Sequence, residues 1–277
     1  MIADEPVLSP QDDLSLAIEA AMSARNLLRD AYQSCATDHT SMSVERIAEL
    51  ACAAEEVIST ALMKSFPEQP ILSAASKTIT SASPFWLLEP LDGRCAFAFH
   101  AGRDLPATLL ARQTSHVTDL AVVFFPLTDA CFSAARGQGA YKNGKRLTTQ
   151  DAPKTLDRCW IDVDHADDPS LESIGVRSLR HTLRKFAPIV TTMPSHAAGT
   201  VRIAESNRRR WHAIVRDNAP VRVKHEAWHI AAPQCVLQEA GGVMHAICGK
   251  SVDPFRPEPF IAAANADLAR AILRCLG

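Results

Sequence analysis

Hydrophobic residues recur at helical spacing over two stretches near the N-terminus. The first stretch predicts a long amphipathic helix over residues 10–33, since Ser9-Pro10 is a typical helix start and the apolar positions are Leu14, Ile18, Ala21, Ala24 and Leu28. The second predicts a helix over Val44–Lys64, which Phe66-Pro67 ends. Both helices should bury one face against a layer that the rest of the chain supplies.

Short apolar runs follow, and they are typical of buried strands. In the first half we expect strands at 71–72, 85–88, 105–112, 120–125 and 131–135, with Asn143-Gly144 as a hairpin turn. From about residue 150 the elements become shorter, with strands at 159–163, 187–191, 211–215, 243–246 and 260–263 and helices at 170–184, 197–208, 227–240 and 266–276. The pattern predicts a layered α/β protein in two successive halves, residues 1–153 and 154–277.

Composition and charge give no support for a nucleic-acid-binding, membrane or secreted protein. The chain has 277 residues, is 47% hydrophobic and carries a formal net charge of -2, which gives no support for binding nucleic acid or an anionic membrane. No apolar run reaches the roughly 18 residues of a membrane span, and the acidic start Met1–Pro6 lacks the basic residues of a signal peptide. Eight scattered cysteines without C-x-x-C spacing favour a reducing cytoplasm.

Candidate chemistry lies in the stretch Trp86-Leu87-Leu88-Glu89-Pro90-Leu91-Asp92-Gly93-Arg94. An apolar strand runs into two carboxylates, a proline and a glycine, so we expect an acidic turn at the strand end. Carboxylates at such a position are typical of a metal or phosphate site, because Mg²⁺ prefers about six oxygen ligands.

This stretch resembles the "W-x-x-D-P-L-D-G-T" motif of the inositol monophosphatase family. Residues 134–144 resemble its "A-x-x-G-x-G-A-(F/Y)-x-N-G" hairpin, and Trp228–Ala232 with Glu239–Gly242 resemble its "W-D-x-A-A…E-A-G-G" helix. The blocks occur in family order from about residue 10 to 275. The resemblance implies a five-layered αβαβα sandwich, often dimeric, that hydrolyses a phosphate monoester with magnesium ions.

Carried over residue by residue, the resemblance implies a site with catalytic Asp92 and Glu89. It places the candidate metal ligands at Glu89, Asp92, His229 and the Leu91 carbonyl. We expect phosphate or substrate binding by Gly93, Arg94, Cys95 and Ser195. Asp92 matches the family aspartate, whereas Glu89 replaces an aspartate and lengthens the arm by about 1.5 Å.

Other positions depart from the family pattern. Ala74 replaces a metal-binding glutamate, Ala51 falls where an aspartate helps activate water, and Pro194-Ser195 is what remains of a phosphate-side "G-S" segment. Arg94 replaces the threonine that orients the attacking water, and His229 replaces the aspartate of "W-D". A neutral histidine suits Zn²⁺ or Mn²⁺ better than Mg²⁺.

These departures leave alternatives open at each residue. Glu89 and Asp92 form either a weak metal site or a turn that caps the next helix. Arg94 either grips phosphate in place of a cation or forms a salt bridge to Glu89 or Asp92. His229 is either a ligand or base, or a hydrogen-bonded, half-buried histidine.

Two functions are therefore expected. The first is a family member with a depleted magnesium site, weak or no phosphatase activity and a retained pocket for a phosphorylated small molecule. The alternative is an active, divergent, magnesium-dependent phosphomonoesterase acting on a sugar, inositol or nucleotide phosphate. In both cases we expect a homodimer that binds neither nucleic acid nor membranes.

Overall fold

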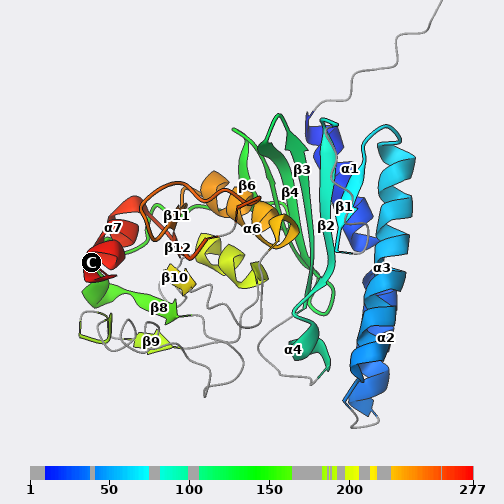
Figure 1. Cartoon of the computed structure of the whole chain (residues 1–277), viewed down its shortest axis with the longest axis horizontal. Helices are drawn as coiled ribbons and strands as arrows, with labels where there is room; N and C mark the ends of the chain where they lie inside the picture. Colours follow the sequence, from blue (N-terminus) through cyan, green and yellow to red (C-terminus); the bar gives the residue numbers. More distant parts are fainter. Residues whose placement is uncertain are drawn as a thin grey trace, which may run out of the picture.

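A computed structural model gives the fold of the chain (Figure 1). It describes residues 10–37, 41–74, 82–98, 106–163, 183–185, 187, 189–191, 197–205, 213–216, 226–256 and 258–276. Among these, no helix combines the length and the apolar character that crossing a bilayer would require.

Three N-terminal helices form the first layer, at one side of the molecule in Figure 1. They are α1 (Pro10–Met22), α2 (Arg25–Thr37) and α3 (Val44–Ser65). The predicted single helix over 10–33 is wrong, because the chain turns at Ser23 and Ala24. The Ser23 amide and hydroxyl both donate to the Ala20 carbonyl, at 3.1 and 2.7 Å, and α1 ends at this turn before α2 begins at Arg25. The predicted helix over 44–64 is confirmed, with Ser43 as its N-cap.

The second layer is a seven-stranded sheet whose strands follow the order of the chain. Its strands are β1 (Ile71–Ser73), β2 (Phe85–Asp92), β3 (Ala107–Thr114), β4 (Val117–Phe125), β5 (Ala130–Ala135), β6 (Gly139–Lys142) and β7 (Lys145–Arg146). Only β1 and β2 of this sheet pair in parallel. The Asn143-Gly144 hairpin turn is confirmed, since both residues have positive φ, 47° and 76°.

The remaining layers come from the second half of the chain. Helix α6 (Ala227–Glu239) and the 3-10 helix η3 (Ala197–Glu205) lie between the two sheets, and α7 (Ala266–Leu276) covers the far side (Figure 1). The second sheet has the order β11 (Val243–Ala246), β12 (Phe260–Ala263), β10 (Ala213–Arg216), β8 (Trp160–Val163) and β9 (Ile189–Thr191). Two short elements complete the described fold, α4 (Arg94–Ala98) and the 3-10 helix η1 (Leu156–Arg158).

The layers run helices, sheet, helices, sheet, helix, so the predicted five-layered αβαβα sandwich is confirmed. The predicted helix over 197–208 is a 3-10 helix instead, and nearly all of the predicted helix 170–184 lies outside the described residues.

Alternation along β2 directs its side chains to two different cores. Trp86 and Leu88 pack with the N-terminal helices, whereas Phe85 and Leu87 pack with α6 and the second sheet. Because both faces of β2 are covered, the strand is buried along its whole length. Continuing the alternation puts Glu89 on the face that α6 covers.

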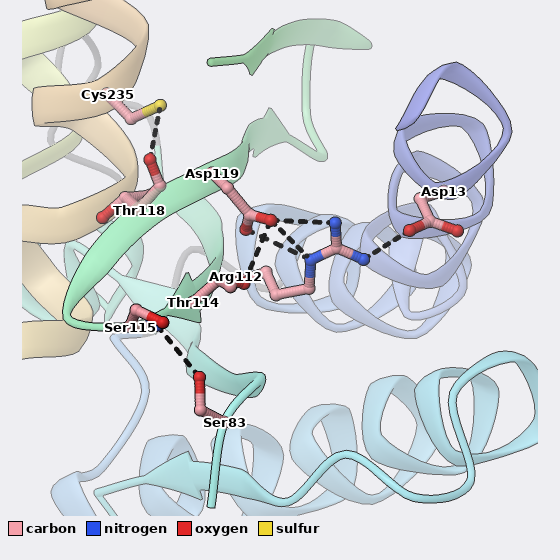
Figure 2. A network of polar contacts seen from close by, with 8 residues as sticks. All are labelled: Asp13, Ser83, Arg112, Thr114, Ser115, Thr118, Asp119 and Cys235. Carbon is pink, nitrogen blue, oxygen red and sulfur yellow. Dashed lines mark hydrogen bonds and ion pairs between the residues drawn. The ribbon is translucent and has the colours of Figure 1, made fainter. Parts of the chain in front are cut away.

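A buried arginine links α1 to the first sheet through ion pairs (Figure 2). Arg112 on β3 is 9% exposed and donates to Asp119 on β4 and to Asp13 on α1. Its guanidinium also lies 5.8 Å from the centre of the Trp86 ring. Since one cation meets two carboxylates, α1 is held to the sheet by charge as well as by apolar packing.

Candidate functional site

The acidic turn lies where β2 ends beside β3. Pairing shifts between Glu89 and Asp92, because Glu89 faces Leu109 and Asp92 faces Ala107. The chain therefore bulges at Pro90-Leu91, and the buried Thr108 hydroxyl donates to the Pro90 carbonyl at 3.0 Å. Gly93, with φ of 79°, then turns the chain into α4.

Glu89 is the central group of this turn. It is 2% exposed, and its carboxylate contacts groups from three different places in the fold. Oε1 accepts from the Leu91 amide at 3.2 Å and lies 3.1 Å from Nη2 of Arg94. Oε2 lies 3.4 Å from Nε2 of His229 on α6.

These contacts set the charge state of Glu89. Burial acts to raise its pKa, but the hydrogen bond and charge of His229, followed by those of Arg94, outweigh burial and lower the pKa below its ordinary value. Glu89 is therefore ionised at neutral pH, in spite of being enclosed.

Arg94 contacts two groups of the turn at once. While Nη2 pairs with Glu89, Nε donates to the Leu91 carbonyl at 3.3 Å. The salt bridge considered from the sequence is thus present, and its carboxylate partner is Glu89. Carboxylate and carbonyl are also the two oxygen groups that the family pattern assigns to a cation at these residues.

His229 is held in place by the start of α6. Its Nδ1 accepts from the Glu226 amide at 3.1 Å, so we assign the ring proton to Nε2, which faces Glu89. The residue is half-buried and hydrogen-bonded, as one of the two sequence interpretations expected.

The other predicted site residues are less closely gathered. Asp92 is buried at the end of β2 and Cys95 lies in α4, while Ser195 is outside the described residues. Ala74 directly follows β1, the strand parallel to β2, and Ala51 is buried on α3. Methyl groups thus stand at both positions at which the sequence resemblance implies carboxylates.

Magnesium fits this arrangement poorly. A carboxylate has about four lone-pair positions, and the Leu91 amide, Arg94 and His229 already lie at about three of those of Glu89. In the part of the chain that the structure describes, no three His, Cys, Asp or Glu side chains are grouped as metal ligands would be. The metal roles of Glu89, Leu91, Asp92 and His229 stay predictions, and the contacts disfavour them.

Sequence reasoning missed Thr108 and Glu226, which fix the positions of the turn and the imidazole. Neither residue belongs to the motifs that point to the site. Thr108 stands across the sheet from the bulge, and Glu226 acts through its backbone amide, which no sequence pattern distinguishes.

Solved structures share this architecture. The extragenic suppressor protein suhB from Bartonella henselae superposes with a TM-score of 0.77 at 22% identity, over 95% of this chain and 98% of that one. The class is therefore the αβαβα fold of inositol-monophosphatase-like proteins. Residues 9–276 match the model of the inositol monophosphatase family, and the chain belongs to that family.

Curated relatives match this chain either over about half of its length or over nearly all of it. The Nus factor SuhB of Escherichia coli K12 is 33% identical over 152 residues, which cover 52% of this chain and 55% of that protein. The matched region is thus about half the length of the SuhB relatives. Inositol monophosphatase 2 of Mus musculus is 23% identical over 278 residues, or 97% of this chain and 91% of its own length.

Proposed function

We propose that this chain is an inositol monophosphatase family protein with little or no magnesium-dependent phosphatase activity, and that it binds a phosphorylated small molecule. The observation that carries the proposal is the placement of Arg94, whose guanidinium contacts both the Glu89 carboxylate and the Leu91 carbonyl.

Charge explains why hydrolysis should be weak. The family reaction uses two or three ions to activate water and neutralise the leaving oxygen. Here Ala51 and Ala74 bring no carboxylate, and Arg94 adds a fixed positive charge beside Glu89. A divalent ion would have to displace the guanidinium before it could use the same oxygens.

Arg94 supports the binding of an anion. Its side chain is 39% exposed, and Nη1 makes no hydrogen bond to any described residue. A planar guanidinium with one exposed edge is suited to phosphate oxygens. Glu89 holds the other edge, so the group is already oriented before a ligand arrives.

A second candidate is an active, divergent phosphomonoesterase. Asp92 and the carboxylate of Glu89 are retained, and two carboxylates with water can hold one Mg²⁺ weakly. Some relatives are named inositol monophosphatases, whereas SuhB is named a Nus factor.

Hydrolysis assays separate these two functions. We expect no metal-dependent phosphate release from inositol-1-phosphate, adenosine bisphosphate or fructose bisphosphate, with either Mg²⁺ or Mn²⁺. Metal-dependent turnover that Asp92→Asn abolishes would establish the phosphomonoesterase and overturn the proposal. Light scattering on the same samples tests the expected homodimer.

Calorimetry with inorganic phosphate tests the pocket without requiring activity. Binding should weaken about tenfold in Arg94→Thr, since one charged hydrogen-bonding group is lost. Arg46→Thr is the matched control, because Arg46 is an exposed arginine on α3 that pairs with Glu49. Equal affinity in the two variants would show that Arg94 is not the anion contact.

A further inference from the structure

We infer that Arg94 and His229 act together as a built-in block of a divalent-cation site, each contacting a different oxygen of the Glu89 carboxylate. This inference rests on the proposed function and explains its weak catalysis. It concerns the two residues jointly, although they come from separate elements, α4 and α6.

The Arg94 half of the block acts as a substitute cation. Its Nη2 lies 3.1 Å from Oε1 of Glu89 and its Nε 3.3 Å from the Leu91 carbonyl. A bound divalent ion would need these oxygens and would also be repelled by the guanidinium at contact distance. Since an arginine keeps its proton at any pH the protein survives, only movement of the side chain can open the site.

The His229 half blocks the other oxygen through helix capping. The Glu226 amide donates to Nδ1 and thereby directs the Nε2 proton toward Oε2 of Glu89. An aspartate at this position could still accept from the same amide at the helix start. The imidazole therefore keeps the capping contact and adds a donor toward Glu89, where an aspartate would add an oxygen ligand.

Changing Arg94 or His229 alone should not open the site, because the other residue still contacts Glu89. Without Arg94, the imidazole proton still points at Oε2; without His229, the guanidinium still lies against Oε1 and the Leu91 carbonyl. The two substitutions should therefore show coupled effects on cation affinity, because they share Glu89 as a partner.

The test is Mg²⁺ binding to four folded proteins: wild type, Arg94→Thr, His229→Asp and the double variant. We expect the double variant to bind Mg²⁺ at least about tenfold more tightly than wild type, the scale on which ligand-supporting groups change metal affinity. Its gain should exceed the product of the two single gains. Calorimetry measures the Mg²⁺ affinity of each protein, and the shift of its melting temperature with Mg²⁺ gives an independent measure of binding.

Matched controls make the same chemical changes elsewhere. Arg46→Thr with His116→Asp alters an exposed helix and an exposed turn, so Mg²⁺ affinity should remain that of wild type. If the aspartate variant fails to fold, Arg94→Thr with His229→Asn removes the imidazole proton without adding charge, and it should still gain Mg²⁺ affinity over either single change.

Three outcomes would overturn the block: wild-type protein binding Mg²⁺ as tightly as the double variant, full gain from one substitution alone, or no gain in any folded variant. The last result, with wild type inactive in the hydrolysis assays, would leave the proposed function intact. Metal-dependent hydrolysis by wild type would instead overturn the proposed function itself.

Discussion

Two regions that carry family motifs differ in how many of their contacting side chains match the family pattern. At the glycine hairpin, Glu239 of α6 accepts from the Gly137 and Gly139 amides, each at 2.9 Å, and all three residues follow the family pattern. At the end of β2, Glu89 also joins α6 to the first sheet, but its partners Arg94 and His229 both depart from the pattern.

The difference teaches which contacts the fold needs. The hairpin amides are backbone groups of a tight turn, and a carboxylate with two oxygens satisfies both of them. The β2 turn is supported by the sheet, by the Thr108 hydroxyl and by Gly93, so its charged side chains can change while the backbone stays in place.

The largest expected effect lies just after α6, at Gly242. A Cβ there would lie 2.3 Å from Cδ1 of Leu237 and 2.9 Å from the Ala263 carbonyl oxygen. We expect Gly242→Ala to lower the free energy of unfolding by about 3 kcal/mol, since the backbone oxygen cannot move aside. Urea denaturation measures this loss.

Gly249→Ala is the control for that measurement. Gly249 has φ of 84° but open space around its Cβ position, so we expect a loss of only about 1 kcal/mol. Equal losses of stability at the two glycines would mean that close packing around Gly242 does not add to the cost of the substitution.

A middle-sized effect is expected for Glu239→Gln. The amide keeps one acceptor oxygen but turns its NH₂ group toward the second hairpin amide, so we expect a loss of about 2 kcal/mol. Glu56→Gln on the exposed face of α3 should change little. If both variants unfold at the same urea concentration, the hairpin does not depend on this carboxylate.

Arg94→Thr should have a smaller effect on stability. Glu89 keeps the Leu91 amide and His229, and water can reach the space of a side chain that is 39% exposed. We expect a loss of about 1 kcal/mol. A loss larger than that of Glu239→Gln would reverse the comparison and make the β2 turn the more structural of the two regions.

The smallest effect concerns three buried cysteines. Burial raises the pKa of the Cys131, Cys159 and Cys235 thiols to about 12, so at pH 8 these groups are almost entirely protonated. We expect a thiol reagent to label the exposed Cys52 and Cys248 quickly and these three only after unfolding. Mass spectrometry of native protein checks the order.

Hydrophobic spacing was sufficient to predict most elements, because burial on a sheet or helix face imposes a period on the chain. It predicted α3 and the strands β1 to β5 of the first sheet, whereas the Asn-Gly dipeptide predicted the hairpin turn at Asn143-Gly144. It failed at Ser23, where two helices share one continuous apolar stripe and a local hydrogen bond decides the break.

Family motifs in the sequence indicated the five layers and brought Glu89, Asp92, Arg94 and His229 to one candidate site. Only the tertiary structure decided which partners these charges have. Arg94 could have reached Glu89 or Asp92, and His229 could have turned either nitrogen toward the turn. Those choices depend on the β2 bulge and on the amide at the start of α6, which lie far apart in the chain and meet only when the two halves pack together.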